Sequence, residues 1–354
     1  MQHAEPALAA SSYGTGTYAL LWVILAAVLA LPFAVHRVER NLELFLLVMG
    51  TVATTISGLW SPALIVEALR EPIAITLVVL AAGLLFHYGR RTVERGFRAL
   101  RARVPLRLLV FLIVVGLGLL SSLVTAIIAS LLLVEAINLL NLDRHIEERL
   151  TILTCFSIGL GAALTPIGEP LSTIVTSKLH GDFWLLARLM GAWILPGVLV
   201  LGCLAALIHP RQDSDTLKDV RQHEDLSEVW IRTVKVFAFV AALVLLGTGL
   251  TPLVDRFVTR LPAAVLFWVN MVSAVLDNAT LAAAEISVAM TRDQLTAALL
   301  GLLISGGMLI PGNIPNIVAA GHLKITSRAW ARTGVPVGLI TMGLYFVVWL
   351  ALRA

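Results

Sequence analysis

The sequence predicts an all-α polytopic membrane protein with inverted repeats, each containing a re-entrant helical hairpin and a discontinuous transmembrane helix. Three observations support this prediction. The 354 residues are 58% hydrophobic and only 14% charged, whereas soluble domains are about one-quarter charged. Two apolar stretches are too long for a single membrane crossing. Two further apolar stretches are each interrupted by a pair of prolines.

Apolar segments long enough to cross a hydrocarbon core of about 30 Å recur along the whole chain. We expect membrane segments near residues 18–35, 42–60, 71–88, 106–140, 150–178, 184–208, 233–250, 262–291, 294–322 and 331–351. The first residues lack the basic region of a signal peptide, so the first segment is expected to be retained. Cys155 and Cys203 have no motif spacing and are interpreted as small apolar residues.

Segment lengths and charges favour two hairpins. As one helix, residues 106–140 would extend roughly 50 Å at 1.5 Å per residue, and residues 262–291 present the same difficulty. With both stretches as hairpins, most of the 26 Lys and Arg residues fall on the inner side. The N-terminus is then outside, and loops 89–107 and 209–232 are cytoplasmic. Residues 90–107 fit either an amphipathic surface helix or an ordinary inner loop.

The two halves of the chain resemble each other. At an offset of 150 residues, V-T-A-I-I-A-S-L-L-L-V-E (124–135) aligns with A-V-L-D-N-A-T-L-A-A-A-E (274–285). At an offset of 145, Pro166 and Pro170 align with Pro311 and Pro315. The predicted topology inverts the second half relative to the first, which is the usual plan of a secondary transporter with its site near the midplane. We therefore expect four regions: an N-terminal scaffold (1–70), repeat 1 (71–208), a cytoplasmic linker (209–230) and repeat 2 (231–354).

The paired prolines lie in A-L-T-P-I-G-E-P (163–170) and I-P-G-N-I-P (310–315). Two prolines four residues apart cannot both sit in an unbroken helix without loss of backbone hydrogen bonds. Non-helical backbone survives at membrane depth only where protein or a water-filled cavity surrounds it. The broken helices, 150–178 and 294–322, thus predict a cavity lined by free carbonyls and helix ends. For one motif alone, a kinked helix with structural prolines would be an equal explanation.

Carboxylates within the apolar segments are candidate functional groups, because an unpaired charge at the bilayer centre costs several kcal/mol. Asp277 and Asn278 fall at the expected turn of the second hairpin, where the first hairpin has Ile127 and Ile128, and Glu169 falls in the first break. Such oxygen ligands suit a hard cation or protons alternating with one. The alternatives are a turn cap at Asp277 and a hydrogen bond from freed backbone to Glu169.

Three other charged residues are weaker candidates. Glu135 and Glu285 occupy equivalent positions on the return limbs of the two hairpins, where structural pairing is the simpler interpretation. Lys178 lies at the end of a segment, where snorkelling of its long side chain to the interface explains it.

The broken segment G-A-A-L-T-P-I-G-E-P (161–170) and the hairpin turn S-A-V-L-D-N-A-T (273–280) resemble the ion transporter superfamily. That group includes divalent anion/sodium symporters, arsenite permeases and the NhaD class of sodium/proton antiporters. L-D-N is most similar to the NhaD class, and the whole chain is most similar to a branch described as cation transporters. The resemblance covers roughly residues 106–350.

The resemblance implies that two hairpins and two discontinuous helices form a moving unit with elevator-like motion, in a homodimer. Ligands in the family come from hairpin tips and unwound backbone. With the residues singled out above, the candidate cation- and proton-binding set is Asp277, Asn278, Glu169, Thr280, Thr125, Thr165, Asn313, Asn316 and Ser130. Asp277, Asn278 and Glu169 are the expected sodium ligands.

The expected function is exchange of sodium or lithium for protons by alternating access. The alternative is transport of a small oxyanion or dicarboxylate by the same fold, and a channel stays open as well. The chain lacks H-E-x-x-H and G-x-S-x-G, so we do not expect an enzyme. We expect no cofactor beyond the transported ions, no nucleic acid partner, and a location in the plasma or inner membrane, with inorganic ions and the lipid bilayer as partners.

Overall fold

The computed structural model describes residues 13–353 except 36, 39–40, 74–75, 78–79, 82–83, 85–102, 141, 209–225, 259 and 275–277. Over these residues the regular structure is helical, without strands. The α-helices are α1 (Thr15–Ala34), α3 (Leu42–Ser57), α5 (Leu106–Val124), α6 (Ala126–Leu140), α7 (Arg144–Ala162), α8 (Pro170–Lys178), α9 (Leu185–Leu207), α10 (Leu226–Leu253), α11 (Ala263–Val269), α12 (Asn278–Glu285), α13 (Arg292–Ser305), α14 (Ile314–Leu323) and α15 (Ser327–Ala351). Residues 62–73 are also helical. Shorter turns are η1 (Val254–Val258), η2 (Asn270–Ala274) and η3 (Ile310–Gly312).

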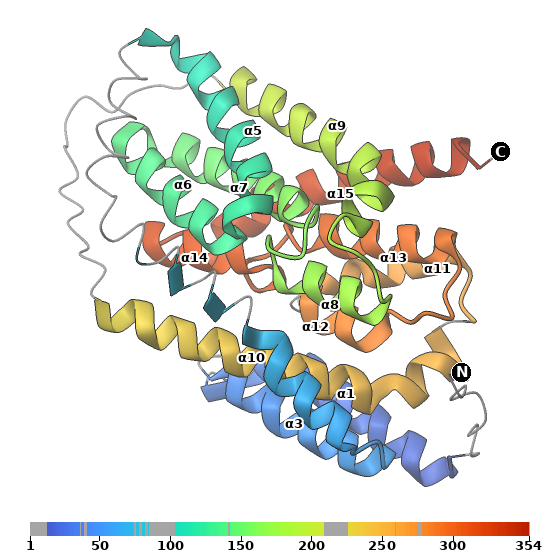
Figure 1. Ribbon diagram of the computed structural model, residues 1–354. Helices are drawn as coiled ribbons and strands as arrows, with labels where there is room; N and C mark the ends of the chain where they lie inside the picture. Colours follow the sequence, from blue (N-terminus) through green and yellow to red (C-terminus); the bar gives the residue numbers. More distant parts are fainter. Residues whose placement is uncertain are drawn as a thin grey trace.

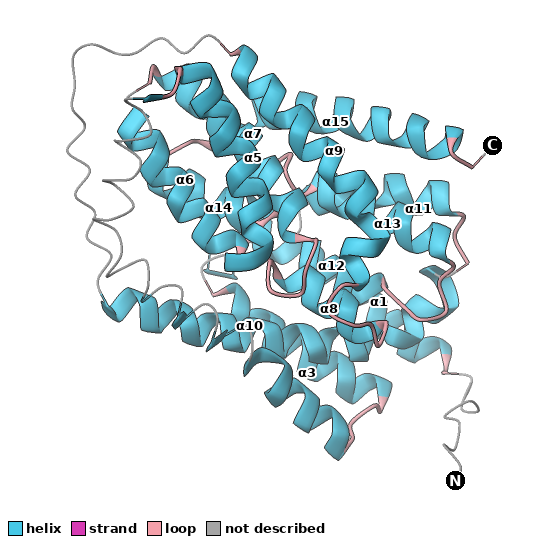
Figure 2. Ribbon diagram, turned by 45° about the horizontal axis from the view of Figure 1, so that its top comes forward, coloured by secondary structure: helices cyan, strands magenta, loops and turns pink. Residues whose placement is uncertain are grey.

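Helices α1, α3 and α10 form a layer of their own, below the other helices in Figures 1 and 2. We call it the scaffold layer, and the helices α5–α9 and α11–α15 the central body. Small residues allow α3 and α10 to approach closely: a Cβ added to Gly50 would lie 2.8 Å from the Leu246 nitrogen. The hydroxyl of Thr54 also donates to the Leu245 carbonyl at 2.8 Å, so the contact is polar as well as tight.

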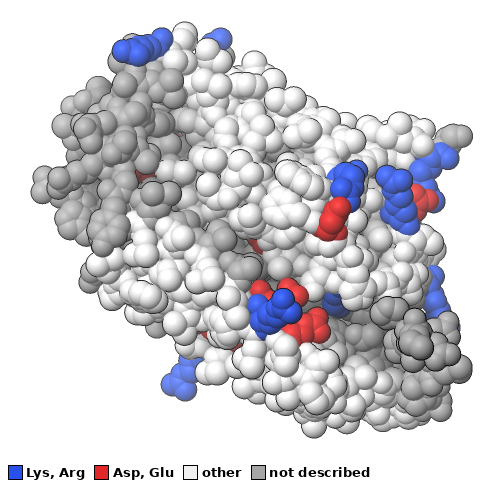
Figure 3. Space-filling view, in the orientation of Figure 1, with Lys and Arg blue, Asp and Glu red and all other residues white. Residues whose placement is uncertain are grey.

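Much of the outer surface formed by the described residues is apolar. Among the described residues, four helices are long and apolar enough to cross a membrane, namely α5, α9, α15 and the Val229–Leu253 part of α10. Figure 3 shows a face that is mainly uncharged, with a few small groups of charged side chains. Large apolar side chains on α9 and α15, such as Leu207 and Ile340, are more than half exposed. Water would oppose such exposure and lipid would not, so the molecule is a membrane-embedded protein.

Both over-long stretches are divided. The first becomes α5 and α6, which contact each other and are separated by one residue, Thr125. Thr125 has φ 84°, a conformation that L side chains rarely adopt, and this φ ends α5. The second stretch becomes α11 and η2, followed by α12, and residues 275–277 between them lie outside the described part.

Both proline-containing segments are interrupted as the sequence predicts. Helix α7 ends at Ala162 and α8 begins at Pro170; α13 ends at Ser305 and α14 begins at Ile314. Each short helix has its proline within the first two positions, where the missing N–H costs no hydrogen bond. Two irregular backbone segments thus lie within the central body.

The contacts between helices recur in the two halves. Helix α5 packs on α7 as α11 packs on α13, and α7 packs on α9 as α13 packs on α15. Helix α6 packs on α14, while α12 packs on α8. The second limb of each divided stretch therefore packs against the short helix of the opposite half. This reciprocal packing brings both irregular segments to the centre of the central body.

Candidate cation-binding site

The first break is closely packed against the α5–α6 junction. The Ala126 N–H donates to the Gly168 carbonyl at 2.7 Å, and the Thr165 hydroxyl donates to the Ser122 carbonyl at 2.5 Å. Thr125 and Thr165 are both buried. Of the predicted site residues, these two are thus brought together where the first half turns and unwinds.

Two hydroxyl groups satisfy carbonyls freed in the first break. Ser172 donates to the Ala162 carbonyl at 3.2 Å and Thr173 to the Pro166 carbonyl at 2.5 Å. Each of these carbonyls lies in or beside the interruption between α7 and α8. The protein's own side chains therefore supply hydrogen bonds that a continuous helix would have supplied.

Glu169 lies at the end of this break. It is buried, with 3% of its surface exposed, and its backbone is extended. It occupies the position before α8, although its carboxylate does not cap that helix. The predicted partner acid, Asp277, lies outside the described residues, so the distance between the two acids stays untested. The segments that follow them, α8 and α12, are in contact.

The second break contains a cluster of carbonyl oxygens. A Cβ added to Gly312 would lie 2.6 Å from the carbonyl oxygens of Gly306 and Ser273, and 3.0 Å from that of Ala274. Ser273 and Ala274 end η2, while Gly306 and Gly312 flank the interruption after α13. Backbone oxygens from two segments thus converge on one point, which we call the carbonyl cluster. Only glycine fits at position 312.

Two buried amide side chains border the carbonyl cluster. Asn316 is fully buried, and its Nδ2 donates to the carbonyls of Gly306 at 2.8 Å and Leu309 at 2.9 Å. Asn278 is 2% exposed, and its Nδ2 lies 3.6 Å from the position of a Cβ on Gly306. Both side chains therefore meet at Gly306.

Each amide has one buried atom without a hydrogen-bond partner in the described part of the chain: Nδ2 of Asn278 and Oδ1 of Asn316. A buried, unsatisfied polar atom costs about 1–3 kcal/mol, so proteins keep few of them without a function. The oxygen and nitrogen of an amide exchange places by rotation of the side chain, which lets Asn278 present an oxygen to the same point. Carbonyl and amide oxygens of this kind are ligands that suit a hard cation.

The remaining predicted site residues lie differently. Asn313 is buried against α7, where its Nδ2 would be 2.5 Å from a Cβ on Gly159. The Ser130 hydroxyl donates to the Ala126 carbonyl of its own helix at 2.6 Å. Thr280 lies in α12, directly after Asn278 and Ala279. In the described residues, no group of three or more His, Cys, Asp or Glu side chains is placed to hold a metal ion.

The sequence does not identify the backbone carbonyl oxygens of Ser273 and Ala274 as candidate ligands. A backbone oxygen has no residue type to mark it, and only the packing of η2 against the second break brings these two carbonyls to Gly312. The G-G pair at 306–307 and the glycine at 312 were the available signals, since glycine permits such close approach.

Comparison with protein families gives one match. The family model described as Protein of unknown function (DUF1646) matches residues 18–352, which is nearly the whole chain. Among curated proteins, none matches.

Proposed function

We propose that the chain, which belongs to the DUF1646 family, is a secondary transporter that exchanges sodium or lithium ions for protons by alternating access. The carbonyl cluster around Gly312, bordered by the partnerless amide atoms of Asn278 and Asn316, carries this proposal. In transporters, unwound backbone carbonyls at a broken helix coordinate sodium or protons. In the described part of the chain, such oxygens gather where η2 meets the second break.

In this proposal, two acids couple the ions: Asp277 of the second hairpin turn and Glu169 of the first break. Asp277 directly precedes Asn278, which borders the carbonyl cluster, in the sequence; its own position lies outside the described residues. Glu169 precedes α8, which packs on α12. An ionised carboxylate favours a bound cation, and protonation removes that attraction. Cation and proton thus compete, which is the requirement for exchange.

The architecture proposed for this exchange is an inverted repeat with re-entrant hairpins, α5–α6 and α11–α12, that move in an elevator-like manner within a homodimer. The recurring contacts of the two halves support the repeat, and the reciprocal packing of α6 on α14 and α12 on α8 supports a two-fold relation between them. In each half, the first limb of the divided stretch ends beside an interrupted helix. Transporters with alternating access have their sites at such interrupted helices.

The charge distribution favours a cation over an anion. Every arginine side chain whose exposure is described lies at the surface, so none of these can hold an oxyanion at the breaks. The alternative function, transport of a small oxyanion or dicarboxylate, would need the N-termini of α8 and α14 to bind the anion without a buried positive charge.

The test is ion flux in proteoliposomes after a pH jump, with sodium, lithium, potassium, small oxyanions and dicarboxylates compared side by side. We expect saturable proton efflux driven by sodium or lithium. Asp277→Asn should abolish it while the protein still elutes as a folded species. Asp293→Asn, the same chemical change at an exposed residue, is the matched control and should keep full exchange. Full activity of Asp277→Asn, or uptake of oxyanion instead of cation, contradicts the proposal.

A further inference from the structure

A second group of charged residues lies away from the carbonyl cluster, at the far end of α12. Lys178, the last residue of α8, donates its ammonium group to the carbonyls of Ala283 at 2.6 Å and Ile286 at 3.2 Å. The C-terminal end of a helix has carbonyls without intrahelical partners and attracts cations. Lys178 therefore does more than snorkel, because it joins the end of α8 to the end of α12.

Glu285 is the last residue of α12 and is 8% exposed. Its Oε1 accepts a hydrogen bond from Nδ2 of Asn270 at 2.6 Å, and Lys178 interacts with it electrostatically. Asn270 also donates to the Ala298 carbonyl at 3.2 Å, which holds the amide in place. Helices α10 and α13 and the turns η1 and η2 also pack on α12, and among the described residues the charged group that acts on Glu285 is Lys178. A buried carboxylate of this kind is held as an anion by its partners or takes up a proton.

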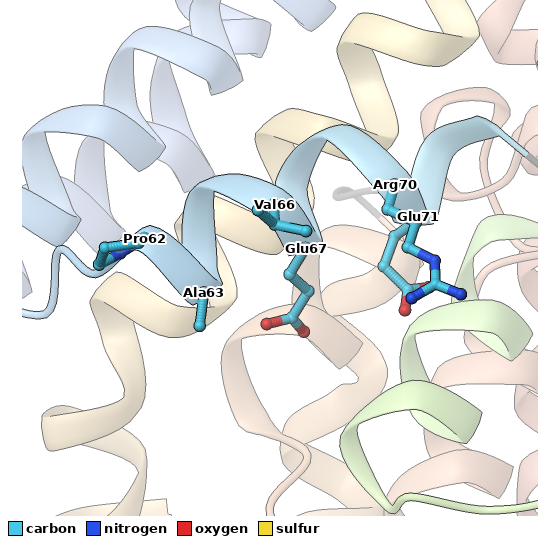
Figure 4. A pocket seen from close by; sticks show the side chains of 6 residues that line it. All are labelled: Pro62, Ala63, Val66, Glu67, Arg70 and Glu71. Carbon is cyan, nitrogen blue, oxygen red and sulfur yellow. The ribbon is translucent and has the colours of Figure 1, made fainter.

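An open pocket lies along the helix formed by residues 62–73. It has a volume of about 580 Å³ and is lined by Pro62, Ala63, Val66, Glu67, Arg70 and Glu71. Figure 4 shows Glu67, Arg70 and Glu71 extending to the same side of the helix formed by residues 62–73.

The pocket glutamates are connected to α8. The Ser177 hydroxyl donates to Oε1 of Glu71 at 3.3 Å, one residue before Lys178. Glu67 interacts electrostatically with Glu71, His180 and Lys178. Lys178 thus interacts with carboxylates of two segments: Glu67 at the open pocket and Glu285 at the end of α12.

We propose that Glu285 is a second proton-binding group of the protein, which exchanges its proton with water in the Glu67–Glu71 pocket, and that Lys178 is its countercharge. A hydronium ion in the pocket gives its proton to the Glu285 carboxylate, which becomes a neutral carboxyl, and Lys178 stays an ammonium ion. Neutral Glu285 no longer attracts Lys178, so proton uptake weakens the contact between α12 and α8. For its role in transport this inference rests on the proposed function; the proton binding itself does not.

Infrared difference spectra of the purified protein as a function of pH test the proton binding directly, through the C=O stretch of a protonated carboxyl. Glu285→Gln should remove one titrating band. Glu135→Gln, the same change at the equivalent position of the other half, should keep that band. Lys178→Gln should move its midpoint toward higher pH, since a positive countercharge is lost. A band that persists in Glu285→Gln, or a midpoint unmoved in Lys178→Gln, overturns the inference.

Sodium-dependent thermal stabilisation, measured on the same samples, separates the two proposals. Glu285→Gln should retain the sodium response of the wild type, because the carbonyl cluster is intact. If the wild type shows no sodium response but Glu285→Gln still removes the band, the proposed function fails and the proton-binding group stands. If the sodium response is present and the band is unaffected, the proposed function stands and this inference fails. If Glu285→Gln does not fold, the midpoint of the band in Lys178→Gln is compared with that of the wild type instead, together with the sodium response.

Discussion

Replacing Gly312 by alanine tests the carbonyl cluster as a cation site. The new Cβ would lie 2.6 Å from the oxygens of Gly306 and Ser273 and 3.0 Å from that of Ala274. Carbon–oxygen contacts in proteins settle at about 3.3–3.6 Å, so the first two oxygens must withdraw by roughly 0.7–1 Å. All three belong to the backbone and cannot yield by a change of rotamer. Overpacking of this kind costs about 1–3 kcal/mol.

If that cost falls on the bound state, sodium affinity decreases roughly 5- to 150-fold, at about 1.4 kcal/mol for each factor of ten. The assay is thermal unfolding in detergent with increasing sodium chloride, compared with choline chloride at equal ionic strength. A ligand at 100 times its Kd stabilises by about 2.7 kcal/mol; a hundredfold weaker affinity leaves about 0.4 kcal/mol. The sodium-dependent shift of the Tm should therefore be clearly smaller in Gly312→Ala than in the wild type, and almost absent if the loss of affinity is hundredfold.

Gly321→Ala is the matched control. Gly321 lies in α14, and a Cβ there would meet nothing within 4 Å. Alanine in a helix interior is favoured over glycine by about 1 kcal/mol, so this variant should be as stable as the wild type or slightly more stable, with an unchanged sodium response. Equal sodium responses in Gly312→Ala, Gly321→Ala and the wild type would refute the cation site at Gly312.

Three further predictions follow from contacts outside the carbonyl cluster. Thr165→Val keeps the side-chain shape but removes the hydrogen bond to the Ser122 carbonyl, so the free energy of unfolding should fall by about 1–3 kcal/mol, which denaturant titration measures. Arg144→Ala removes two 2.8 Å hydrogen bonds to carbonyls at the end of α14; because the side chain is exposed, we expect a loss of only about 1 kcal/mol in the same assay. The hydrogen bond from Arg188 lowers the pKa of Asp182 below its ordinary value. The stability that this pair adds is therefore present above the ordinary pKa of about 4 and is lost as pH falls through the lowered value. Asp182→Asn should therefore reduce the fall of the Tm at acidic pH.

The interruptions of the helices could be predicted from the sequence because proline acts locally. Pro166, Pro170, Pro311 and Pro315 each remove a backbone donor, and no tertiary contact can restore it. The division of residues 106–140 was predictable from length alone. Its position at Thr125 was not, because a threonine with φ 84° is unfavourable by itself and is held there by contacts between distant segments, such as that of Ala126 with Gly168.

The candidate site was predictable only through its side chains. Asn278 and Asn316 stood out as polar residues in apolar surroundings, and the structure places both at Gly306. The role of Lys178 was missed, because its position at a segment end fits snorkelling equally well. Which carbonyls an ammonium group reaches depends on the packing of α8 against α12, and sequence periodicity contains no information about that pairing.

The reciprocal packing of α6 on α14 and of α12 on α8 constrains how the protein is made. The ribosome completes α8 about 100 residues before it begins α12, which at 5–20 residues per second is roughly 5–20 s of synthesis. During this interval the first break, with Glu169, lacks its cover from the second half. A first half synthesised alone would keep that polar backbone against lipid and become a substrate for membrane quality control. Split genes encoding the halves should therefore yield stable protein only when both are expressed together in the same cell.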